Sequence, residues 1–274
     1  MPVLFKNELD SALEAARRAG DVILGHYASF QKIDDAPIDI STIADREAQE
    51  LILQRVHAVF PDDALCAEEQ TATLADARKT GRRLWVVDPI DGSRGFAQKN
   101  GEFSVMIAFV EDGVVQVGVV LEPATGVTTS AVRGQGCHVR RQTHKGSLCR
   151  VSSVAEPGAC SLIQSHSKPG KTSWPVEILK PAKVIETYSA GVKLARVARG
   201  EADVYVNTYS EFHDWDIAAG HLLVEEAGGR VTGLKGETLR YGEPGAWQRH
   251  GLIAANPALL AKCLHVFQSA RGSL

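Results

Sequence analysis

The chain has 274 residues and a formal net charge of −3 at pH 7. This slightly acidic balance argues against a groove for duplex nucleic acid, which needs clustered positive charge. No apolar run approaches the roughly 20 residues that span a bilayer, and the N-terminal residues lack the apolar core of a signal peptide. The five cysteines form an odd set without a CxxC pair, which indicates reduced thiols. We therefore expect a cytoplasmic protein with no membrane partner.

The first part of the chain, residues 1–150, begins with two helical patterns and continues as a run of strands. Apolar residues recur at helical spacing within 8–29 and 43–60. From residue 84 the period changes, and short β-rich segments follow one another between turn signals. The sequence EDG at 111–113 is a hairpin signal between two of these segments. We therefore predict an antiparallel sheet in this part.

The second part, residues 151–274, follows a polar and irregular stretch at about 141–160. Strand-like segments such as ADVYVN alternate here with helices that we expect near 190–199 and 215–227, and with a last helix from residue 257. This alternation predicts a smaller α/β layer. The whole chain is therefore expected to have a mixed α/β (α+β) fold in two parts.

Acids stand where several of these elements begin or end. Asp88 and Asp91 close the strand in WVVDPIDGS, Glu68 follows the apolar run ALCA, and Asp45 and Asp216 lie near the starts of helices. The ends of elements are where sites are commonly built. Two carboxylates about 4 Å apart repel by about 4 kcal/mol at an effective dielectric near 20. Converging acids therefore need a cation or a shared proton.

The chemistry of such a cluster can be inferred from its ligand atoms. An all-oxygen set selects a hard cation, and Mg²⁺ is the natural choice. Pro89 fixes the backbone between Asp88 and Asp91, so that both carboxylates can aim at one point. Gly92 and Ser93 then open a turn whose free N–H groups suit a phosphate oxygen. Together these features indicate metal-assisted hydrolysis of a phosphate ester.

Each motif also has a simpler structural interpretation. A lone DPxDG is most often a turn, and Thr42 with Asp45 can be only a helix start. Asp214 and Asp216 can likewise be capping residues of the helix that follows. The site interpretation depends on all the spacings fitting one pattern.

The chain resembles the lithium-sensitive, Mg²⁺-dependent phosphatase superfamily that includes inositol monophosphatases, fructose bisphosphatases and 3'(2'),5'-bisphosphate nucleotidases. Three segments carry the resemblance: ISTIADREAQELI with PDDALCAEE, then WVVDPIDGSRGF, and then WDIAAGHLLVEEAGG. It extends from about residue 8 to residue 260. It implies a layered αβαβα sandwich of the inositol monophosphatase and fructose bisphosphatase type, with the site between the two parts.

The resemblance assigns the metal ligands position by position. It gives Glu68, Asp88 and the backbone carbonyl of Ile90 to a first Mg²⁺ ion. It gives Asp88, Asp91 and Asp216 to a second ion, with two or three ions in each site.

The resemblance also assigns the catalytic groups. Asp45 and Ser93 would orient and deprotonate the attacking water, and Glu68 belongs with them. The family usually has threonine where this chain has Ser93, and serine keeps the hydroxyl. Glu69 is expected next to the metal ligands, without binding the ion itself. The pattern therefore implies an active enzyme.

The segment RGFAQKNGEFSVMIAFV resembles the bisphosphate nucleotidases more than the inositol monophosphatases. In the same comparison Lys193 suits a second phosphate, and His166 lies in a segment that nucleotidases place near the nucleotide. Gly92, Ser93 and Ser189 complete the expected substrate contacts. Many nucleotidases carry arginine where this chain has Asn207, which removes one expected contact.

The function implied is removal of the 3'-phosphate of 3'-phosphoadenosine 5'-phosphate, in the context of sulfur assimilation. An inositol monophosphatase or a fructose bisphosphatase-like sugar phosphatase is the alternative, and a metal-binding pseudoenzyme is a further one. The partner is then a small phosphate ester, and a homodimer is compatible with the resemblance.

Overall fold

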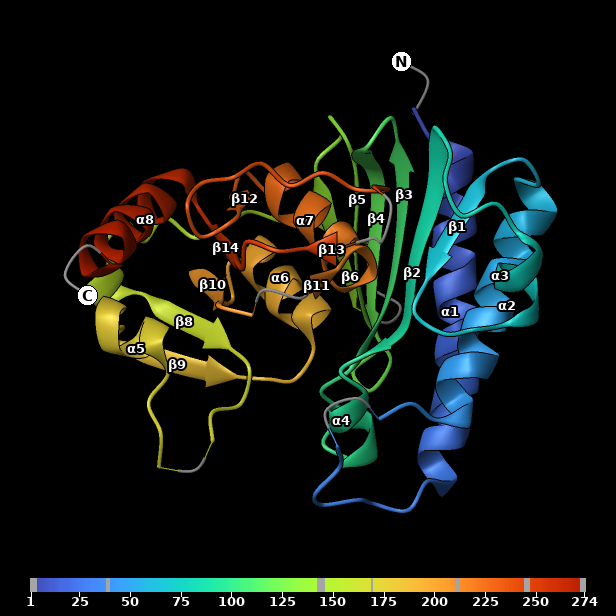
Figure 1. Cartoon of the computed structure of the whole chain (residues 1–274), viewed down its shortest axis with the longest axis horizontal. Coiled ribbons are helices and arrows are strands. Elements are labelled where there is room, and N and C mark those ends of the chain that lie inside the picture. The colour runs from blue at the N-terminus through green and yellow to red at the C-terminus, as the bar shows by residue number, and fades with distance from the viewer. Residues whose placement is uncertain are drawn as a thin grey trace.

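The structure is a computed structural model that describes residues 4–37, 40–141, 146–168, 170–209, 212–243 and 247–271. Helices and sheets alternate as layers across the molecule (Figure 1). The outer layer consists of α1 (Lys6–Ser29) and α2 (Ile43–Val59), with the short α3 (Ala72–Asp76) beside them. This order agrees with the αβαβα arrangement that the sequence implied.

A seven-stranded sheet forms the next layer, with its strands in sequence order. The first pair is parallel and the remaining pairs are antiparallel. The predicted antiparallel sheet is therefore confirmed, with one parallel strand added at its edge. The strands are β1 (Ala64–Ala67), β2 (Arg83–Asp91), β3 (Ser104–Glu111), β4 (Val114–Glu122), β5 (Val127–Val132), β6 (Cys137–Arg141) and β7 (Ser147–Leu148).

Alternate residues of the central strands face opposite helical layers, as the pleat of a strand requires. Trp85 and Val87 of β2 pack in the cluster that contains the buried faces of α1 and α2. Val86 packs in the cluster of α6 (Ala190–Ala198) and α7 (Asp214–Glu226) on the other face. Gly118 of β4 lets α7 approach closely, because an added Cβ would lie 2.6 Å from the carbonyl oxygen of Ala219.

A second, five-stranded sheet lies beyond α6 and α7. Its core is closed on the outer side by α5 (Trp174–Leu179) and α8 (Pro257–Arg271). A single helical turn, η1 (Pro157–Ala159), precedes this sheet, and a two-stranded ribbon pairs β11 (Phe212–His213) with β13 (Trp247–Gln248). The five strands, in spatial order, are β12 (Arg230–Thr232), β14 (Leu252–Ala255), β10 (Val204–Asn207), β8 (Ser161–Gln164) and β9 (Lys183–Glu186).

The two halves of the chain share a core, because strands of the first sheet and helices of the second half pack in one hydrophobic cluster. The first sheet ends at Leu148 and the second begins at Ser161. The division at residue 150 thus falls between the sheets. That residue 150 is also a domain boundary stays a prediction.

The expected hairpin between β3 and β4 is confirmed in detail. Asp112 and Gly113 have φ angles of 51° and 76°, as the two central residues of a type I′ turn require. The stretch at about 141–160 was predicted to be irregular. In its described residues it contains the end of β6, all of β7 and η1.

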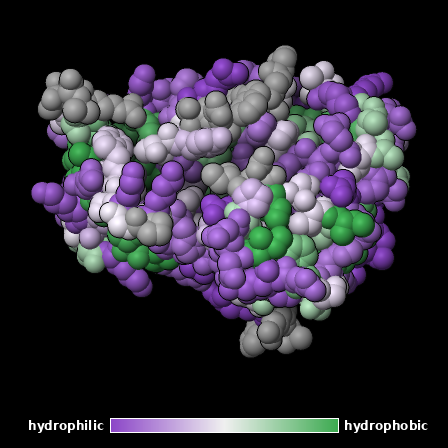
Figure 2. Space-filling model, turned by 60° about the horizontal axis from the view of Figure 1, so that its bottom comes forward, coloured by the Kyte–Doolittle hydropathy of each residue, from purple (hydrophilic) through white to green (hydrophobic). Residues whose placement is uncertain are grey.

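One face of the molecule is mostly polar (Figure 2). Figure 2 shows a side on which hydrophilic residues dominate and apolar residues form separate spots. Among the described residues, no helix combines the length and apolar character needed to cross a bilayer.

Candidate active site

A bulge at the end of β2 brings Asp88 and Asp91 to the same face of the sheet. Asp88 pairs with Met106 of β3, but Asp91 pairs with Ser104, so three steps on β2 match two on β3. In a regular strand, residues three apart point to opposite faces. The extra residue in the bulge restores a common direction, and Pro89, which has no N–H to donate, is tolerated there. Both carboxylates consequently face α6 and α7.

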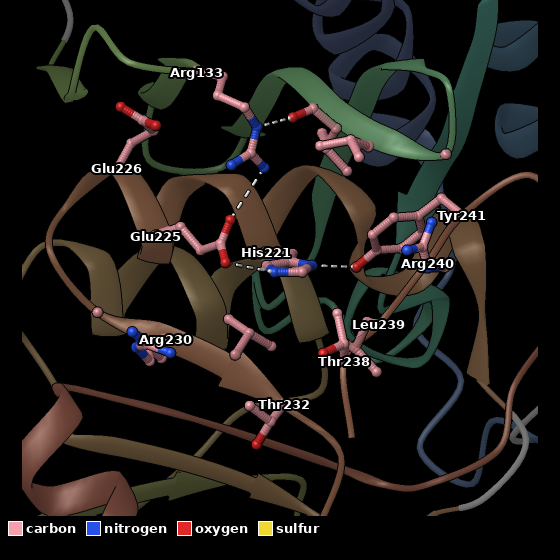
Figure 3. Close-up of a pocket in the computed structure, with 15 residues that line it drawn as sticks. Arg133, His221, Glu225, Glu226, Arg230, Thr232, Thr238, Leu239, Arg240 and Tyr241 are labelled. Atoms are coloured by element: carbon pink, nitrogen blue, oxygen red, sulfur yellow. Dashed lines mark hydrogen bonds and ion pairs between the residues drawn. The ribbon is translucent and has the colours of Figure 1, made fainter. Parts of the chain in front are cut away.

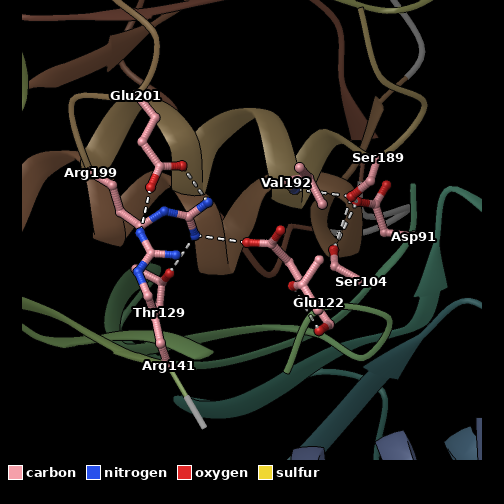
Figure 4. Close-up of polar contacts among 10 residues, drawn as sticks. Asp91, Ser104, Glu122, Thr129, Arg141, Ser189, Val192, Arg199 and Glu201 are labelled. Carbon is pink, nitrogen blue, oxygen red and sulfur yellow. Dashed lines mark hydrogen bonds and ion pairs between the residues drawn. The ribbon is translucent and has the colours of Figure 1, made fainter. Parts of the chain in front are cut away.

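Asp91 joins the sheet to the start of α6 (Figure 4). Its carboxylate accepts hydrogen bonds from the backbone N–H groups of Ala190 (3.1 Å) and Gly191 (2.7 Å). The hydroxyl groups of Ser189 and Ser104 also donate to it. An acid at a helix N-terminus satisfies N–H groups that have no partner in the helix. Asp91 therefore has a structural role in addition to any metal contact.

Asp45 of α2 and Ser93, which follows β2, form a hydrogen-bonded pair. Ser93 is the first residue of α4 (Ser93–Ala97), and its Oγ lies 3.0 Å from Oδ1 of Asp45 and 2.8 Å from the carbonyl oxygen of Ile90. The other Asp45 oxygen accepts from the backbone N–H (2.8 Å) and hydroxyl (2.6 Å) of Thr42, in the capping box of α2. Capping thus fixes the Asp45 carboxylate in one orientation.

Gly92 gives the backbone its turn between these groups. Its φ of 89° is in the left-handed region, and an added Cβ would lie 2.6 Å from the carbonyl oxygen of Glu102. A larger residue would therefore displace Ser93.

Glu68 is positioned by a buried side chain that the sequence did not single out. Gln49 of α2 is completely buried, accepts from the backbone N–H of Glu69 (2.7 Å) and donates to the Glu69 carbonyl (2.5 Å). These two contacts hold the backbone that follows β1. The Glu68 side chain itself remains exposed at the rim. Gln49 lies four residues after Asp45, one helical turn along the same face, and this spacing is the signal that could have revealed it.

Asp216 enters from the first turn of α7. Its carboxylate accepts from the backbone N–H of His213 at 2.6 Å, just before the helix. Asp214, two residues earlier, instead accepts from Gly242 N–H (2.7 Å) and from the Gln248 amide (2.8 Å). The two acids of the HDWD segment therefore have different roles, because Asp214 holds a loop and Asp216 faces the other acids.

The acids perturb one another strongly. Burial, followed by the charges of Glu68, Asp91, Asp216 and Asp45, raises the pKa of Asp88 well above its usual value. Although solvent reaches the Glu68 side chain at the rim, crowding by the surrounding protein, followed by the charges of Asp216 and Asp45, raises its pKa to about 8. Burial, opposed by the His213 hydrogen bond, raises the pKa of Asp216 to about 7. Since these groups act on one another through their charges, the structure brings together the five acids that the sequence grouped.

Asp88 supplies a direct test of whether a cation fits. The side chain is 2% exposed, and its Oδ1 is buried without a hydrogen-bond partner. A buried, unpaired carboxylate oxygen is costly unless a cation or donor meets it. The surrounding donors are all oxygens, which suits Mg²⁺. In the part of the chain that the structure describes, no three of these side chains already stand in ligating positions. The chemistry of the donor set nevertheless fits the ion.

Comparison with known proteins shows which family this chain belongs to. The profile described as the inositol monophosphatase family matches residues 6–271. The chain belongs to the inositol monophosphatase family. It is therefore a phosphatase of that family, and the superfamily predicted from the sequence is confirmed.

Characterised relatives of this family member differ in their substrates. A histidinol-phosphatase of Chlorobaculum parvum is 35% identical over 92% of this chain and 93% of its own. The 3'(2'),5'-bisphosphate nucleotidase CysQ of Salmonella typhimurium is 33% identical, over 85% and 93%. A fructose-1,6-bisphosphatase/inositol-1-monophosphatase of Thermotoga maritima is 32% identical, over 84% and 86%. Identity alone therefore does not select the substrate.

The fold comparison agrees with the family. The structure of an inositol monophosphatase (IMPase) from Thermotoga maritima aligns with a TM-score of 0.79 and 30% identity, over 97% of this chain and 99% of the other. The mixed α/β fold expected from the sequence is thereby confirmed.

Two residues expected to contact substrate are buried in this phosphatase. Ser189 is fully buried and caps α6, accepting from the Val192 N–H at 2.9 Å. Lys193 is 1% exposed, and its ammonium donates to the carbonyl of Tyr188 (2.8 Å) and to Ser165 (3.2 Å). Burial lowers the pKa of Lys193 to about 8. The direct phosphate contact predicted for Lys193 therefore has no support from its position.

His166 lies at the surface. Its Nε2 is 2.7 Å from the Glu102 carboxylate, and its ring lies 4.4 Å from that of Tyr188. Asn207 is committed elsewhere, with its amide donating to the Tyr205 hydroxyl and its oxygen accepting from the Tyr209 N–H. His166 is thus the one expected substrate-binding side chain beyond Ser93 that solvent reaches.

Arg94 is a cation that the sequence interpretation missed. It follows Ser93 directly, its guanidinium lies 5.1 Å from the centre of the Tyr188 ring, and its Nε is buried without a partner. The arginine of DGSR was a visible signal, because it places a fixed positive charge beside the expected phosphate site.

Proposed function

We propose that the protein is an Mg²⁺-dependent phosphomonoester hydrolase whose preferred substrate is 3'-phosphoadenosine 5'-phosphate, which it converts to AMP and phosphate. The observation that carries the proposal is the buried Asp88 carboxylate, whose unpaired oxygen lies among like charges beside the Ser93–Asp45 pair. Such a centre is costly for the fold unless it serves a cation.

The metal ligands in this proposal are Glu68, Asp88, Asp91, Asp216 and the carbonyl of Ile90, with two or three ions. Bound Mg²⁺ would supply the positive charge that offsets the carboxylates and the phosphate oxygens. The protein's contribution is to hold the ligands in place. The bulge aims Asp88 and Asp91, α7 presents Asp216, and Gln49 fixes the backbone next to Glu68.

The Ser93–Asp45 pair provides the proton path. A water molecule beside the Ser93 hydroxyl can pass its proton to Oγ while Ser93 passes its own to Oδ1 of Asp45, 3.0 Å away. The water oxygen attacks phosphorus, the P–O bond to the sugar breaks, and the leaving sugar oxygen takes up a proton from solvent water to become a hydroxyl. Asp45 then returns its proton to solvent. Burial, opposed by the Thr42 hydrogen bonds, raises the pKa of Asp45, which makes its carboxylate a better base.

The choice of a bisphosphate is supported by Arg94 with Tyr188 and His166. The half-buried guanidinium beside Ser93 places a fixed positive charge where a second phosphate could bind. The neighbouring rings of Tyr188 and His166 offer flat surfaces on which a base can stack. Inositol 1-phosphate would use neither feature fully, because it has one phosphate and no aromatic ring.

Histidinol phosphate is a second candidate substrate, favoured by a different observation. Glu102 and Glu186 lie on either side of His166, with carboxylate oxygens 2.7 Å and 3.7 Å from its ring nitrogens. Two acids near the site suit a substrate that carries an amine. Both carboxylates already accept backbone N–H groups, from Tyr188 and Ser167, so we rank this candidate second.

Phosphate release from a panel of substrates tests the proposal. With Mg²⁺ present, kcat/KM should be highest for 3'-phosphoadenosine 5'-phosphate, compared with histidinol phosphate, inositol 1-phosphate and fructose 1,6-bisphosphate. Arg94→Gln should lower kcat/KM about tenfold for the bisphosphate nucleotide, through loss of a charge-assisted contact, and little for inositol 1-phosphate. Arg78→Gln, at an exposed site elsewhere, is the matched control.

A different order of substrates would replace the nucleotide in the proposal. Equal losses with Arg94→Gln on both substrates would remove its residue-level support. Absence of phosphate release from every ester would instead favour the pseudoenzyme. As part of the same proposal we expect inhibition by Li⁺, a cytoplasmic location, a role in sulfur assimilation and assembly compatible with a homodimer.

A further inference from the structure

A cavity of about 550 Å³ lies beside the C-terminal half of α7 (Figure 3). Glu225 lines it, and nine residues separate Glu225 from Asp216, or about 13 Å along a helix. The other walls come from the β3–β4 turn, the end of β5, β12 and the segment 238–241. Cavities of roughly 300–1,000 Å³ are typical of small-molecule sites.

The floor of the cavity is a connected set of polar side chains. The Tyr241 hydroxyl lies 2.6 Å from Nδ1 of His221, and Nε2 of His221 lies 3.3 Å from Glu225. Arg133 donates to the same carboxylate at 3.1 Å and to the carbonyl of Val115 at 2.7 Å. His221 and Tyr241 are both buried. These contacts hold the floor in place before any ligand binds.

The acids of the cavity already have hydrogen-bond partners. Glu225 is paired with Arg133 and His221. Each oxygen of Glu226 accepts a backbone N–H, from Gly134 and Gly136, at 2.8 Å. Neither carboxylate therefore needs a cation from outside.

Positive charge is left over at the edge of the cavity. Arg230 and Arg240 are exposed and flank the cavity on opposite sides in Figure 3. Within the described residues, no ion pair engages either guanidinium. The hydroxyl groups of Thr232 and Thr238 also line the space. Guanidinium groups bind carboxylates and phosphates in two-pronged fashion.

The remaining wall is apolar, formed by the buried side chains of Val115, Val231 and Leu239. From this combination we propose that the cavity binds a small organic anion, with its carboxylate or phosphate at the edge that the charges of Arg230 and Arg240 make positive and its apolar body against the valines and Leu239. The inference is independent of the substrate of the acidic centre.

Ligand-observed ¹⁹F NMR on the full chain tests this site with three probes. These are 4-fluorobenzoate, the non-hydrolysable (4-fluorophenyl)phosphonate and the uncharged 4-fluorobenzamide. A chelator is present, so that the negatively charged active centre repels the anions. We expect saturable binding of at least one anion and none of the amide, and the two anions distinguish a carboxylate ligand from a phosphate ligand.

Variants locate the binding. Arg230→Gln and Arg240→Gln change exposed side chains, so both proteins should fold, and each should weaken the bound probe about tenfold. Arg78→Gln should leave it unchanged. No binding of either anion to the unaltered protein overturns the proposal. Equal binding to all variants, or equal binding of the amide, overturns it as well.

Discussion

The two ends of α7 carry the same kind of side chain in opposite circumstances. Asp216 in the first turn faces other carboxylates, and burial together with their charges raises its pKa to about 7. Glu225 in the last turn accepts from His221 and Arg133, and these contacts lower its pKa to about 2. The protein therefore places its own cations in close contact with Glu225, whereas Asp216, with the His213 ring 3.9 Å away, lies among other carboxylates. An acid that the fold leaves unpaired in a buried place is the better indication of a site.

The comparison also separates neighbouring acids. Asp214 is satisfied by Gly242 and Gln248 although it lies two residues from Asp216. Proximity in sequence thus does not decide which acid serves the reaction. The available partners decide it.

Replacing Asp88 should have the largest effect on activity. Asp88→Asn removes charge at the centre of the acidic cluster, and we expect kcat to fall by at least about 10³-fold. Steady-state phosphate release with Mg²⁺ measures this loss. Glu226→Gln changes an acid at the other end of α7 and should keep kcat within about twofold, since that acid serves the fold. If both variants lose kcat equally, the acids at the far end of α7 matter as much for catalysis as the acidic cluster, and the comparison fails.

Ser93→Ala should have the next largest effect. It removes the hydroxyl that hands a proton to Asp45, so kcat should fall about 10²-fold on every substrate. Ser93→Thr keeps the hydroxyl at the residue type usual in the family and is the matched control. A normal kcat for Ser93→Ala would exclude the proton path.

The smallest effect should appear at the other end of the helix, in stability. Glu225→Gln replaces a charged acceptor of two donors, so the melting temperature should fall by about 2–4 °C, the shift expected for ~1 kcal/mol. Thermal unfolding monitored by circular dichroism measures it, and kcat should not change.

The pH dependence of this loss follows from the pKa of Glu225. The His221 hydrogen bond lowers that pKa from 4.5 to about 2, so the carboxylate stabilises the fold fully above about pH 4.5. The contribution should disappear as pH falls from 4.5 towards 2. The difference in melting temperature between the two proteins should shrink over that interval. A difference that stays constant or grows there would contradict the assignment.

The sequence was sufficient to group the acids, because each follows or opens an element and DPID holds two of them together. It could not show the bulge that turns Asp88 and Asp91 to one face, since a bulge is defined by the register against β3. It also could not show the burial of Lys193 and Ser189, which depends on how α6 packs, so their contact with substrate stays a prediction.

The shortest helices and strands also could not be predicted from the sequence. The five-residue α4 and the short strands β7, β11 and β13 have too few residues to show a period. Tertiary contacts, rather than local pattern, fix them. Gln49 and Arg94 were missed for a related reason, since their roles depend on backbone or rings far away in sequence.

The change in melting temperature on adding Mg²⁺ tests most directly whether the acidic cluster binds a cation. Ligand at 100 times its dissociation constant stabilises a fold by about 2.7 kcal/mol. Saturating Mg²⁺ should therefore raise the melting temperature of the chelated protein and of Glu225→Gln by similar amounts, and leave Asp88→Asn almost unchanged. An equal rise in Asp88→Asn, or no rise in the unaltered protein, would contradict the account.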